Sequence, residues 1–426
     1  MKHQRLIISA LISSFALQVS VFALDSELHG FADGRAGVRT RNDPHEDDRS
    51  LTELRVQLDS LTYLDQATIQ ARADLVYDDL ANDIEKIDLE TGEGFMDLRE
   101  LNVLFTPIDI MDMKIGRQIL TWGSGDLLFI NDLFPKDWNS FLLGRDEEYL
   151  KAPSDAVFAS IFPAIGSFDL AYMPRMDADR YVDGQRISYW NPMMQSVAGQ
   201  NAVIDADRRD DWFRDHEISA RFYRPFLSYE AALYAYHGFW KSPAGLNPST
   251  GKAYFPHLNA YGASVRGTLG SGLVNAETGY YDSREDRSGT DPFVPNSEIR
   301  FMTGYEREVA RNLTAGVQYY LEWMMDYDSY KNNLLTPTDT ARDEARHVLT
   351  LRLTKMLMNQ NLMLSLFTFY SPSDNDAYLR PAATYKLNDH WTVTANGNFF
   401  IGENDYTFFG QFENNSNVNL GVRYSF

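Results

Sequence analysis

Arginine and carboxylate side chains supply most of the chemistry that this sequence offers. They recur in segments where apolar and polar residues alternate, so that the charged residues of a segment share one face. Arginine stays charged and presents a planar fork of donors, which can pair with a neighbouring carboxylate or contact anionic and hydroxylated solutes. The sequence leaves both roles open. The positions are Arg35, Arg55, Arg72, Glu100, Arg221, Arg266, Glu277, Arg300, Arg352, Arg380 and Arg423.

A second set of charges lies in 123–155, a connecting segment that is too apolar to remain exposed to solvent. Its large apolar residues include Phe129, Phe134, Trp138 and Phe141, so we expect it to pack against another part of the protein. Its charged residues are Asp126, Asp132, Lys136, Asp137, Arg145, Glu147, Glu148 and Lys151.

The sequence contains no recognisable catalytic or metal-binding motif. It has no cysteine, and its 8 histidines are scattered without HExxH spacing; no GxxxxGK[ST] loop is present. Cysteine-ligated metal sites and covalently attached haem are therefore excluded. We expect no enzymatic activity, no catalytic residues and no resident cofactor. The net charge of -21 argues against nucleic-acid binding.

The acidic excess is concentrated in 43–48, 78–93, 205–215 and 282–291. One hypothesis is that these stretches bind calcium or attract cationic solutes. The alternative is that they only keep the connecting loops solvated.

Strands must position these residues. The chain contains about eighteen alternating runs of roughly nine to fourteen residues, the length that a tilted strand needs to cross a bilayer. In 417–426, for example, Leu420, Val422 and Tyr424 alternate with Gly421 and Arg423. Both faces of such a strand cannot be buried in a core. The pattern predicts an all-β protein whose sheet has one apolar face and one face in water.

The connections between these runs alternate in length. Every second one, such as 62–65, 270–272 and 388–389, has five residues or fewer, whereas those between them, such as 123–154 and 175–211, are long. This sorting is typical of an antiparallel up-and-down transmembrane barrel, with short periplasmic turns and long extracellular loops. Backbone groups in hydrocarbon must be paired, so the sheet has to close. We expect about 18 strands, with 16 to 18 the plausible range, around an aqueous channel.

The chain resembles Gram-negative outer-membrane porins as a broad class, through these strands and the terminal Asn-Leu-Gly-Val-Arg-Tyr-Ser-Phe. The resemblance implies that Tyr424 and Phe426 belong to the signal that the barrel assembly machinery reads. It also implies that 123–155 folds back as a constriction of the pore; a cap on the rim is the alternative. A narrower likeness, carried by Lys114-Ile115-Gly116-Arg117-Gln118, is to alginate-export-type barrels and uncharacterised porin families.

The first residues predict export. Lys2 and Arg5 precede an uncharged apolar run at 6–17, and Val21-Phe22-Ala23 offers small residues at the spacing of a signal peptidase site. We expect 1–23 to be a signal peptide and 24–426 to be a single barrel domain in the outer membrane of a Gram-negative cell.

These observations favour passive diffusion of small hydrophilic solutes through a charged, arginine-rich lumen. The alternative is a sheath or scaffold around a partner protein, such as a multihaem cytochrome or an export complex. The expected partners are outer-membrane lipid and lipopolysaccharide, the assembly machinery, small solutes and, in a homo-oligomer, further copies of the chain.

Overall fold

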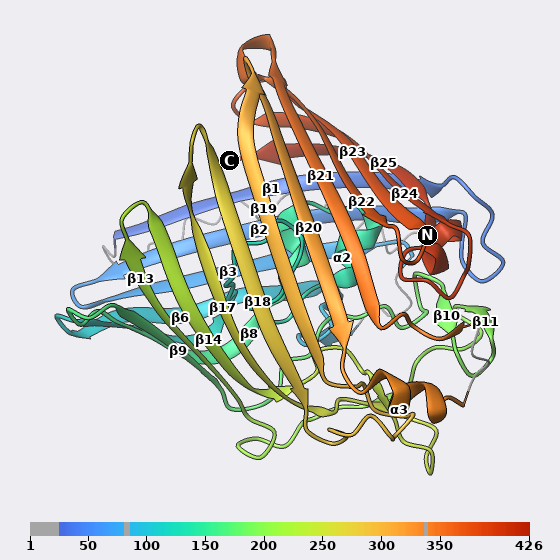
Figure 1. Cartoon of the computed structure of the whole chain (residues 1–426). Helices are drawn as coiled ribbons and strands as arrows, with labels where there is room; N and C mark the ends of the chain where they lie inside the picture. The colour runs from blue at the N-terminus through green and yellow to red at the C-terminus, as the bar shows by residue number, and fades with distance from the viewer. Residues whose placement is uncertain (1–24, 81–85, 336–339) are drawn as a thin grey trace.

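Antiparallel strands form a single closed barrel (Figure 1). The computed structural model describes residues 25–80, 86–335 and 340–426; the predicted signal peptide lies outside them. The 18-stranded sheet pairs each strand with the next along the chain. Its strands are β1 (Asp25–Arg39), β2 (Arg49–Leu64), β3 (Ala67–Asp78), β6 (Met96–Ile108), β7 (Met111–Gln118), β8 (Ser154–Ile161), β9 (Ser167–Met173), β13 (Glu217–Phe226), β14 (Tyr229–Phe239), β17 (His257–Leu269), β18 (Gly272–Ser283), β19 (Glu298–Ala310), β20 (Leu313–Met324), β21 (Ala345–Leu357), β22 (Leu362–Ser371), β23 (Asp376–Lys386), β24 (Trp391–Gly402) and β25 (Asn417–Ser425).

The remaining elements are short and lie in the connections. The strands among them are β4 (Ile87–Asp88), β5 (Glu93–Gly94), β10 (Tyr189–Asn191), β11 (Ser196–Ala198), β12 (Ala206–Asp207), β15 (Gly245–Leu246) and β16 (Ala253–Tyr254). The helices are α2 (Trp138–Leu143), η2 (Glu147–Leu150), α3 (Tyr327–Asn332), η4 (Met358–Gln360) and η5 (Gly410–Asn415). Among the described residues, no helix is both long enough and apolar enough to cross a membrane.

The first and last strands close the barrel. β1 pairs with β25 from Phe31 opposite Ser425 to Arg39 opposite Asn417. Gly30 and Phe426 extend the ladder, each donating its amide to the carbonyl of the other at 3.0 and 2.9 Å. Closure leaves no unpaired strand edge, which a sheet in hydrocarbon requires.

Side chains alternate between the two faces of the wall as the sequence predicts. In β25, Leu420 is 63% exposed on the outside, whereas its neighbour Asn419 is 3% exposed and points inward. The same alternation puts Leu54 outside and Arg55 inside on β2. The predicted all-β barrel with an apolar exterior and a polar interior is thus confirmed.

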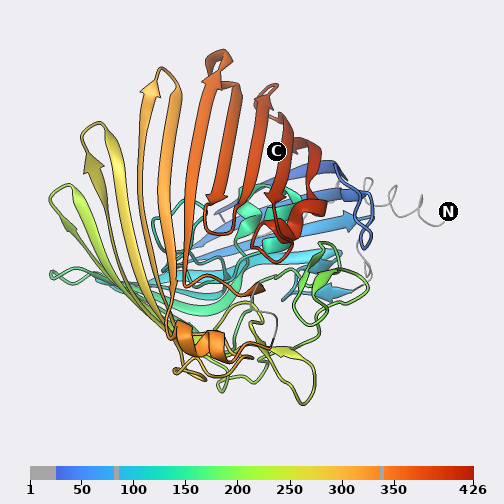
Figure 2. The same cartoon turned by 45° about the vertical axis from the view of Figure 1, so that its right-hand side comes forward.

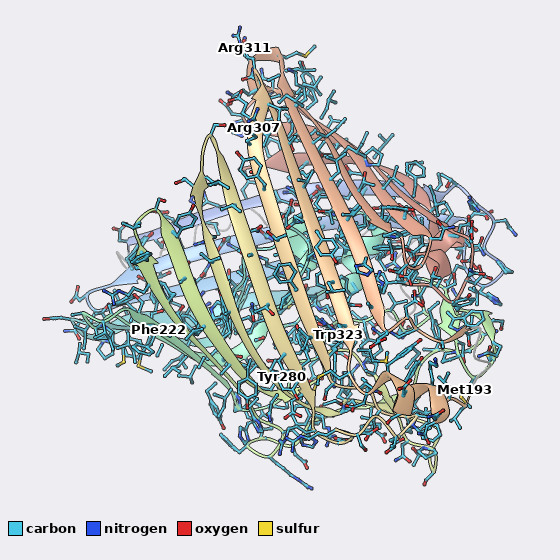
Figure 3. All side chains as sticks on the ribbon, in the orientation of Figure 1. Met193, Phe222, Tyr280, Arg307, Arg311 and Trp323 are labelled. Atoms are coloured by element: carbon cyan, nitrogen blue, oxygen red, sulfur yellow. The ribbon has the colours of Figure 1, made fainter. Side chains whose placement is uncertain are left out.

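The connections sort onto two rims, also as predicted. The turn rim carries 65–66, 109–110, 162–166, 227–228, 270–271, 311–312, 358–361 and 387–390. The loop rim carries the long connections and one short one, 372–375. In Figure 3, Arg307 and Arg311 lie toward the turn rim, while Tyr280 and Trp323 lie near the opposite end of the wall.

Several aromatic residues near strand ends are exposed on the outer surface. Trp323, Tyr385 and Trp391 are exposed there, as expected for rings at the level of lipid headgroups. Two tryptophans that lie beyond strand ends are inside the barrel instead. Trp122 packs edge-on against Phe134 at 4.9 Å, and Trp240 faces a cavity within the barrel. The alternation of side chains cannot predict which face these two residues occupy, because both lie beyond the end of a strand, β7 ending at Gln118 and β14 at Phe239.

Candidate functional site

The longest apolar connection folds into the barrel. We call 119–153, between β7 and β8, the inner loop; Figure 2 shows its helical part enclosed by the strands. Its backbone is held by side chains from distant parts of the wall. Gln318 on β20 donates to the carbonyl of Asp126 at 2.9 Å, and Asn417 on β25 donates to that of Leu142 at 3.3 Å. The segment therefore lies inside the lumen and does not cap the rim.

Apolar contacts and a short helix fix the inner loop in place. Asp137 caps α2 by accepting a hydrogen bond from the Ser140 amide at 2.7 Å. The Phe141 ring on this helix meets Tyr378 of β23 edge-on, with centroids 5.7 Å apart. Gly144 ends the helix at a φ of 86°, and a Cβ there would lie 2.4 Å from Nδ2 of Asn419. Only glycine fits this close approach to the wall in that conformation.

Acidic residues of the inner loop face arginines on the opposite wall. Asp126 lies 2.6 Å from Arg352, and Glu147 lies 3.4 Å from Arg352 and 3.6 Å from Arg380. Glu148 lies 3.4 Å from Arg423. We call these six residues the constriction cluster. Because Glu147 remains 52% exposed, the cluster borders open space within the lumen.

Burial changes the pKa of one member of the constriction cluster, Asp126. It raises the pKa of Asp126 to about 6, with a further contribution from the nearby charge of Glu147 and an opposing one from Arg352. This carboxyl therefore changes charge near neutral pH, whereas an exposed aspartate does so near pH 4.

The other charged residues predicted for the constriction are used differently. Asp132 and Lys136 form a buried pair 2.9 Å apart. Arg145 reaches Glu53 on the wall at 2.6 Å. Asp137 caps α2 and lies 3.4 Å from Arg180. The Lys151 carbonyl accepts a hydrogen bond from Arg99 at 2.6 Å. These residues anchor the loop instead of facing the constriction cluster.

The lumen-wall residues predicted from the sequence all point inward, and their arginines are paired. The pairs are Arg35 with Asp33 and Asp146, Arg55 with Glu53 and Asp74, Arg72 with Asp59 and Glu100, Arg221 with Asp169 and Glu230, Arg266 with Glu230, Arg300 with Glu298, and Arg423 with Asp33 and Asp146. Glu277 accepts hydrogen bonds from the inner loop, through the Ser124 amide and Asn131. Of the two roles that the sequence left open, mutual pairing is the one that the geometry displays.

Arg99 and Arg180 are among the inward-facing arginines that the sequence analysis missed. Arg180 belongs to 174–216, a second connection that folds inward, and it pairs with Asp97 at 2.7 Å. Arg99 sits at an irregularity in the pairing of β3 with β6, which turns both Arg99 and Glu100 toward the lumen. Strict alternation assigns neighbours to opposite faces, so it cannot reveal a bulge. The connection 174–216 is polar and gave no apolar signal of burial.

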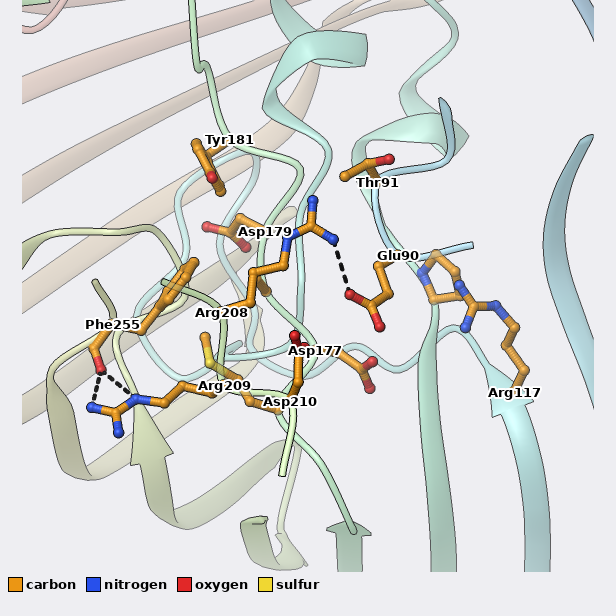
Figure 4. A pocket seen from close by; sticks show the side chains of 13 residues that line it. Glu90, Thr91, Arg117, Asp177, Asp179, Tyr181, Arg208, Arg209, Asp210 and Phe255 are labelled. Carbon is orange, nitrogen blue, oxygen red and sulfur yellow. Dashed lines mark hydrogen bonds and ion pairs between the residues drawn. The ribbon is translucent and has the colours of Figure 1, made fainter. Parts of the chain in front are cut away.

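A small polar pocket lies where 86–95 and 174–216 meet (Figure 4). Arg208 and Glu90 pair across it at 3.1 Å. Burial and the neighbouring charge of Asp155 raise the pKa of Asp177, also in this pocket, to about 7. Within the described ranges, no group of three or more histidine and acidic side chains is arranged to hold a metal ion. Calcium binding by the acidic stretches stays a prediction, which titration calorimetry can check.

No family model matches the chain, and no curated protein does. Its fold is nevertheless similar to those of solved Gram-negative outer-membrane porins. OccAB3 of Acinetobacter baumannii aligns with a TM-score of 0.56 at 9% identity, over 94% of this chain and 99% of that one. OccK3 of Pseudomonas aeruginosa aligns with a TM-score of 0.55 at 10% identity, over 94% of this chain and 96% of that one. OccD3 of the same species aligns with a TM-score of 0.54 at 10% identity, over 94% of this chain and 91% of that one. The porin-like fold expected from the sequence is thereby confirmed; the narrower likeness to alginate-export-type barrels stays a prediction.

Proposed function

We propose that this protein is an outer-membrane channel through which small hydrophilic solutes diffuse passively. One observation carries the proposal: inside a closed barrel with an apolar exterior, acidic residues of the inner loop pair with wall arginines, and Glu147 and Glu148 of these pairs remain exposed to the lumen. These exposed charges border the aqueous space of the lumen, where charged side chains select among polar solutes.

The barrel interior leaves little space for the alternative role as a sheath. A sheath needs a bore that is free of its own segments. Here the inner loop crosses the lumen between Gln318 of β20 and Asn417 of β25, and 174–216 adds Arg180 beside it. Outer-membrane lipid, lipopolysaccharide and the barrel assembly machinery are the partners that a channel of this class requires.

Conductance in planar bilayers tests the proposal. Purified protein should give discrete current steps, and reversal potentials in asymmetric salt should report ion preference. A protein that inserts but stays electrically silent would contradict a channel.

Thiol chemistry can place the passage, because the chain has no cysteine of its own. We expect a charged, water-soluble thiosulfonate reagent to reduce the current through Glu147→Cys, whose side chain faces the lumen. Leu420→Cys is the matched control: it is equally accessible on the outer face but is shielded by lipid. If the reagent blocks neither variant, the solutes do not pass the constriction cluster.

A further inference from the structure

A cavity of about 500 Å³ lies within the barrel, between the inner loop and the loop rim. One side is the wall formed by β17 to β22, including Tyr281, Tyr320 and Phe369. The other side comes from four separate connections, through Phe129 and Trp138, Tyr181, Trp240, and Phe408. We call it the aromatic chamber. Its volume is that of sites which bind small organic molecules in proteins.

The rings in the chamber come from segments far apart in sequence. Phe129 and Trp138 meet edge-on at 6.2 Å, and Phe408 meets Phe409 edge-on at 4.9 Å. Phe408 is half-exposed although it lies inside a loop that packs on the barrel. The Arg346 guanidinium lies over the Phe408 ring, 4.7 Å from its centroid, and the part of the ring that stays exposed offers a contact surface for a planar solute.

The cations that line the chamber are already neutralised. Lys241 lies 2.6 Å from Glu217, and Lys136 lies 2.9 Å from Asp132. Arg346 lies 2.6 Å from Asp374, and Arg300 pairs with Glu298. An anionic solute would have to displace one of these carboxylates, which are largely buried. The chamber therefore gives an anion no net attraction that would offset its loss of water.

Two hydrogen-bond donors among the chamber residues lack an acceptor. Nε1 of Trp240 and Nη2 of Arg346 are both buried, and neither has a partner in the described part of the chain. Buried donors are nearly always paired in folded proteins, so these two mark places where an oxygen atom of a bound solute would be favourable.

We propose that the aromatic chamber binds uncharged, ring-bearing solutes that carry an acceptor oxygen, such as phenols and benzyl alcohols. This inference rests on the proposed channel function and names the class of solute that the channel favours. The chamber lies on the loop side of the constriction cluster. A solute that enters from that rim meets the rings first and the charges second.

Titration calorimetry on the purified full-length protein tests the selectivity. We expect 4-hydroxybenzyl alcohol to bind, glucose to give no measurable heat, and benzoate to bind at least about fivefold more weakly than the alcohol. Glucose binding as tightly as the alcohol would overturn selection by the rings. Benzoate binding more tightly would overturn selection against charge.

Two substitutions and a control locate the binding. Phe408→Ala should weaken binding of the alcohol by about fivefold, because it removes a stacking ring. Trp240→Phe keeps a ring but removes the donor, and should weaken binding by about threefold. Phe213→Ala removes an exposed ring outside the chamber and should change nothing. Equal affinities in all three variants would overturn the proposal.

Bilayer conductance separates this inference from the channel proposal. If wild-type protein conducts but does not bind the alcohol, the chamber proposal fails and the channel stands. If it binds the alcohol but never conducts, the channel proposal fails.

Discussion

At the level of single residues, the barrel interior is built from charges that neutralise one another. Wall arginines pair with carboxylates on their own strand, on the next strand or on the inner loop. Such pairs cost desolvation energy, and removing one partner leaves an unbalanced buried charge. The constriction cluster differs because solvent still reaches Glu147 and Glu148.

Asp126 should make ion preference depend on pH. Its pKa is raised to about 6, so it is negative above that pH and neutral below it. As the pH falls from 7 to 5, the passage loses a negative charge beside Arg352, and we expect the reversal potential to shift toward anion preference. Asp126→Asn should show the low-pH preference at pH 7, with a smaller further shift. Asp177→Asn is the control, since this residue lies outside the constriction cluster. A variant that shifts with pH as much as wild type would contradict the assignment.

Glu53 should be important for stability. It is buried between Arg55 at 2.9 Å and Arg145 at 2.6 Å, and so joins β2 to the inner loop. Glu53→Gln removes the negative charge that balances the guanidinium groups of Arg55 and Arg145. We expect it to lower the free energy of unfolding by about 3 kcal/mol, measured by urea unfolding in lipid vesicles. Asp211→Asn, at an exposed pair with Arg214, should cost less than about 1 kcal/mol. Equal losses would contradict this role.

At the level of elements, the inner loop sets the width of the passage. A barrel of this strand number encloses more space than its own side chains fill. Deleting 126–150 should therefore raise single-channel conductance severalfold. Deleting 247–252, the tip between β15 and β16, should leave conductance unchanged, because the backbone hydrogen bonds of this tip join its own residues. The Asn247 amide donates to the Lys252 carbonyl, and the Gly251 amide donates to the Asn247 carbonyl. Unchanged conductance in the first variant would mean that the loop does not limit flow.

The elements also show what a sequence can and cannot predict. Alternation and connection lengths predicted the strands, the turns and the fold, because lipid and water impose opposite requirements on neighbouring side chains. The apolar residues of 123–155 predicted that this segment packs. They could not specify that Glu147 meets Arg352, which depends on how the loop crosses the lumen. The chamber, the bulge at Arg99 and the position of Arg180 arise from such long-range packing too.

For the whole molecule, net charge should steer ions. The chain carries a formal charge of -21, with its acidic stretches largely in the long loops. A negative mouth concentrates cations, but salt screens this field over about 10 Å at 0.1 M and about 3 Å at 1 M. We expect cation preference in dilute KCl to weaken strongly near 1 M, as measured by reversal potentials. A preference that survives at high salt would place selection at the constriction cluster instead.

Assembly should depend on the last residue of the closing strand. Phe426 pairs through its backbone with Gly30, and its ring lies 6.3 Å from that of Tyr424. If these aromatics form the assembly signal, Phe426→Ala should reduce the fraction of protein that reaches the membrane as folded barrel, measured by heat-modifiable migration. Phe226→Ala, at an exposed position on the same rim, should assemble normally. Equal yields would contradict such a signal.

The attachments of the inner loop imply an order of events during folding. Its partners include Glu53 near the start of the barrel, Gln318 on β20 and Asn417 at the end. No incomplete ribbon can present all of them at once. We therefore expect the loop to reach its final position only after the last strand has joined the sheet, so that the narrowest part of the passage forms last. A newly assembled molecule would pass through a leaky stage, wider than the mature one, before it acquires any ability to discriminate.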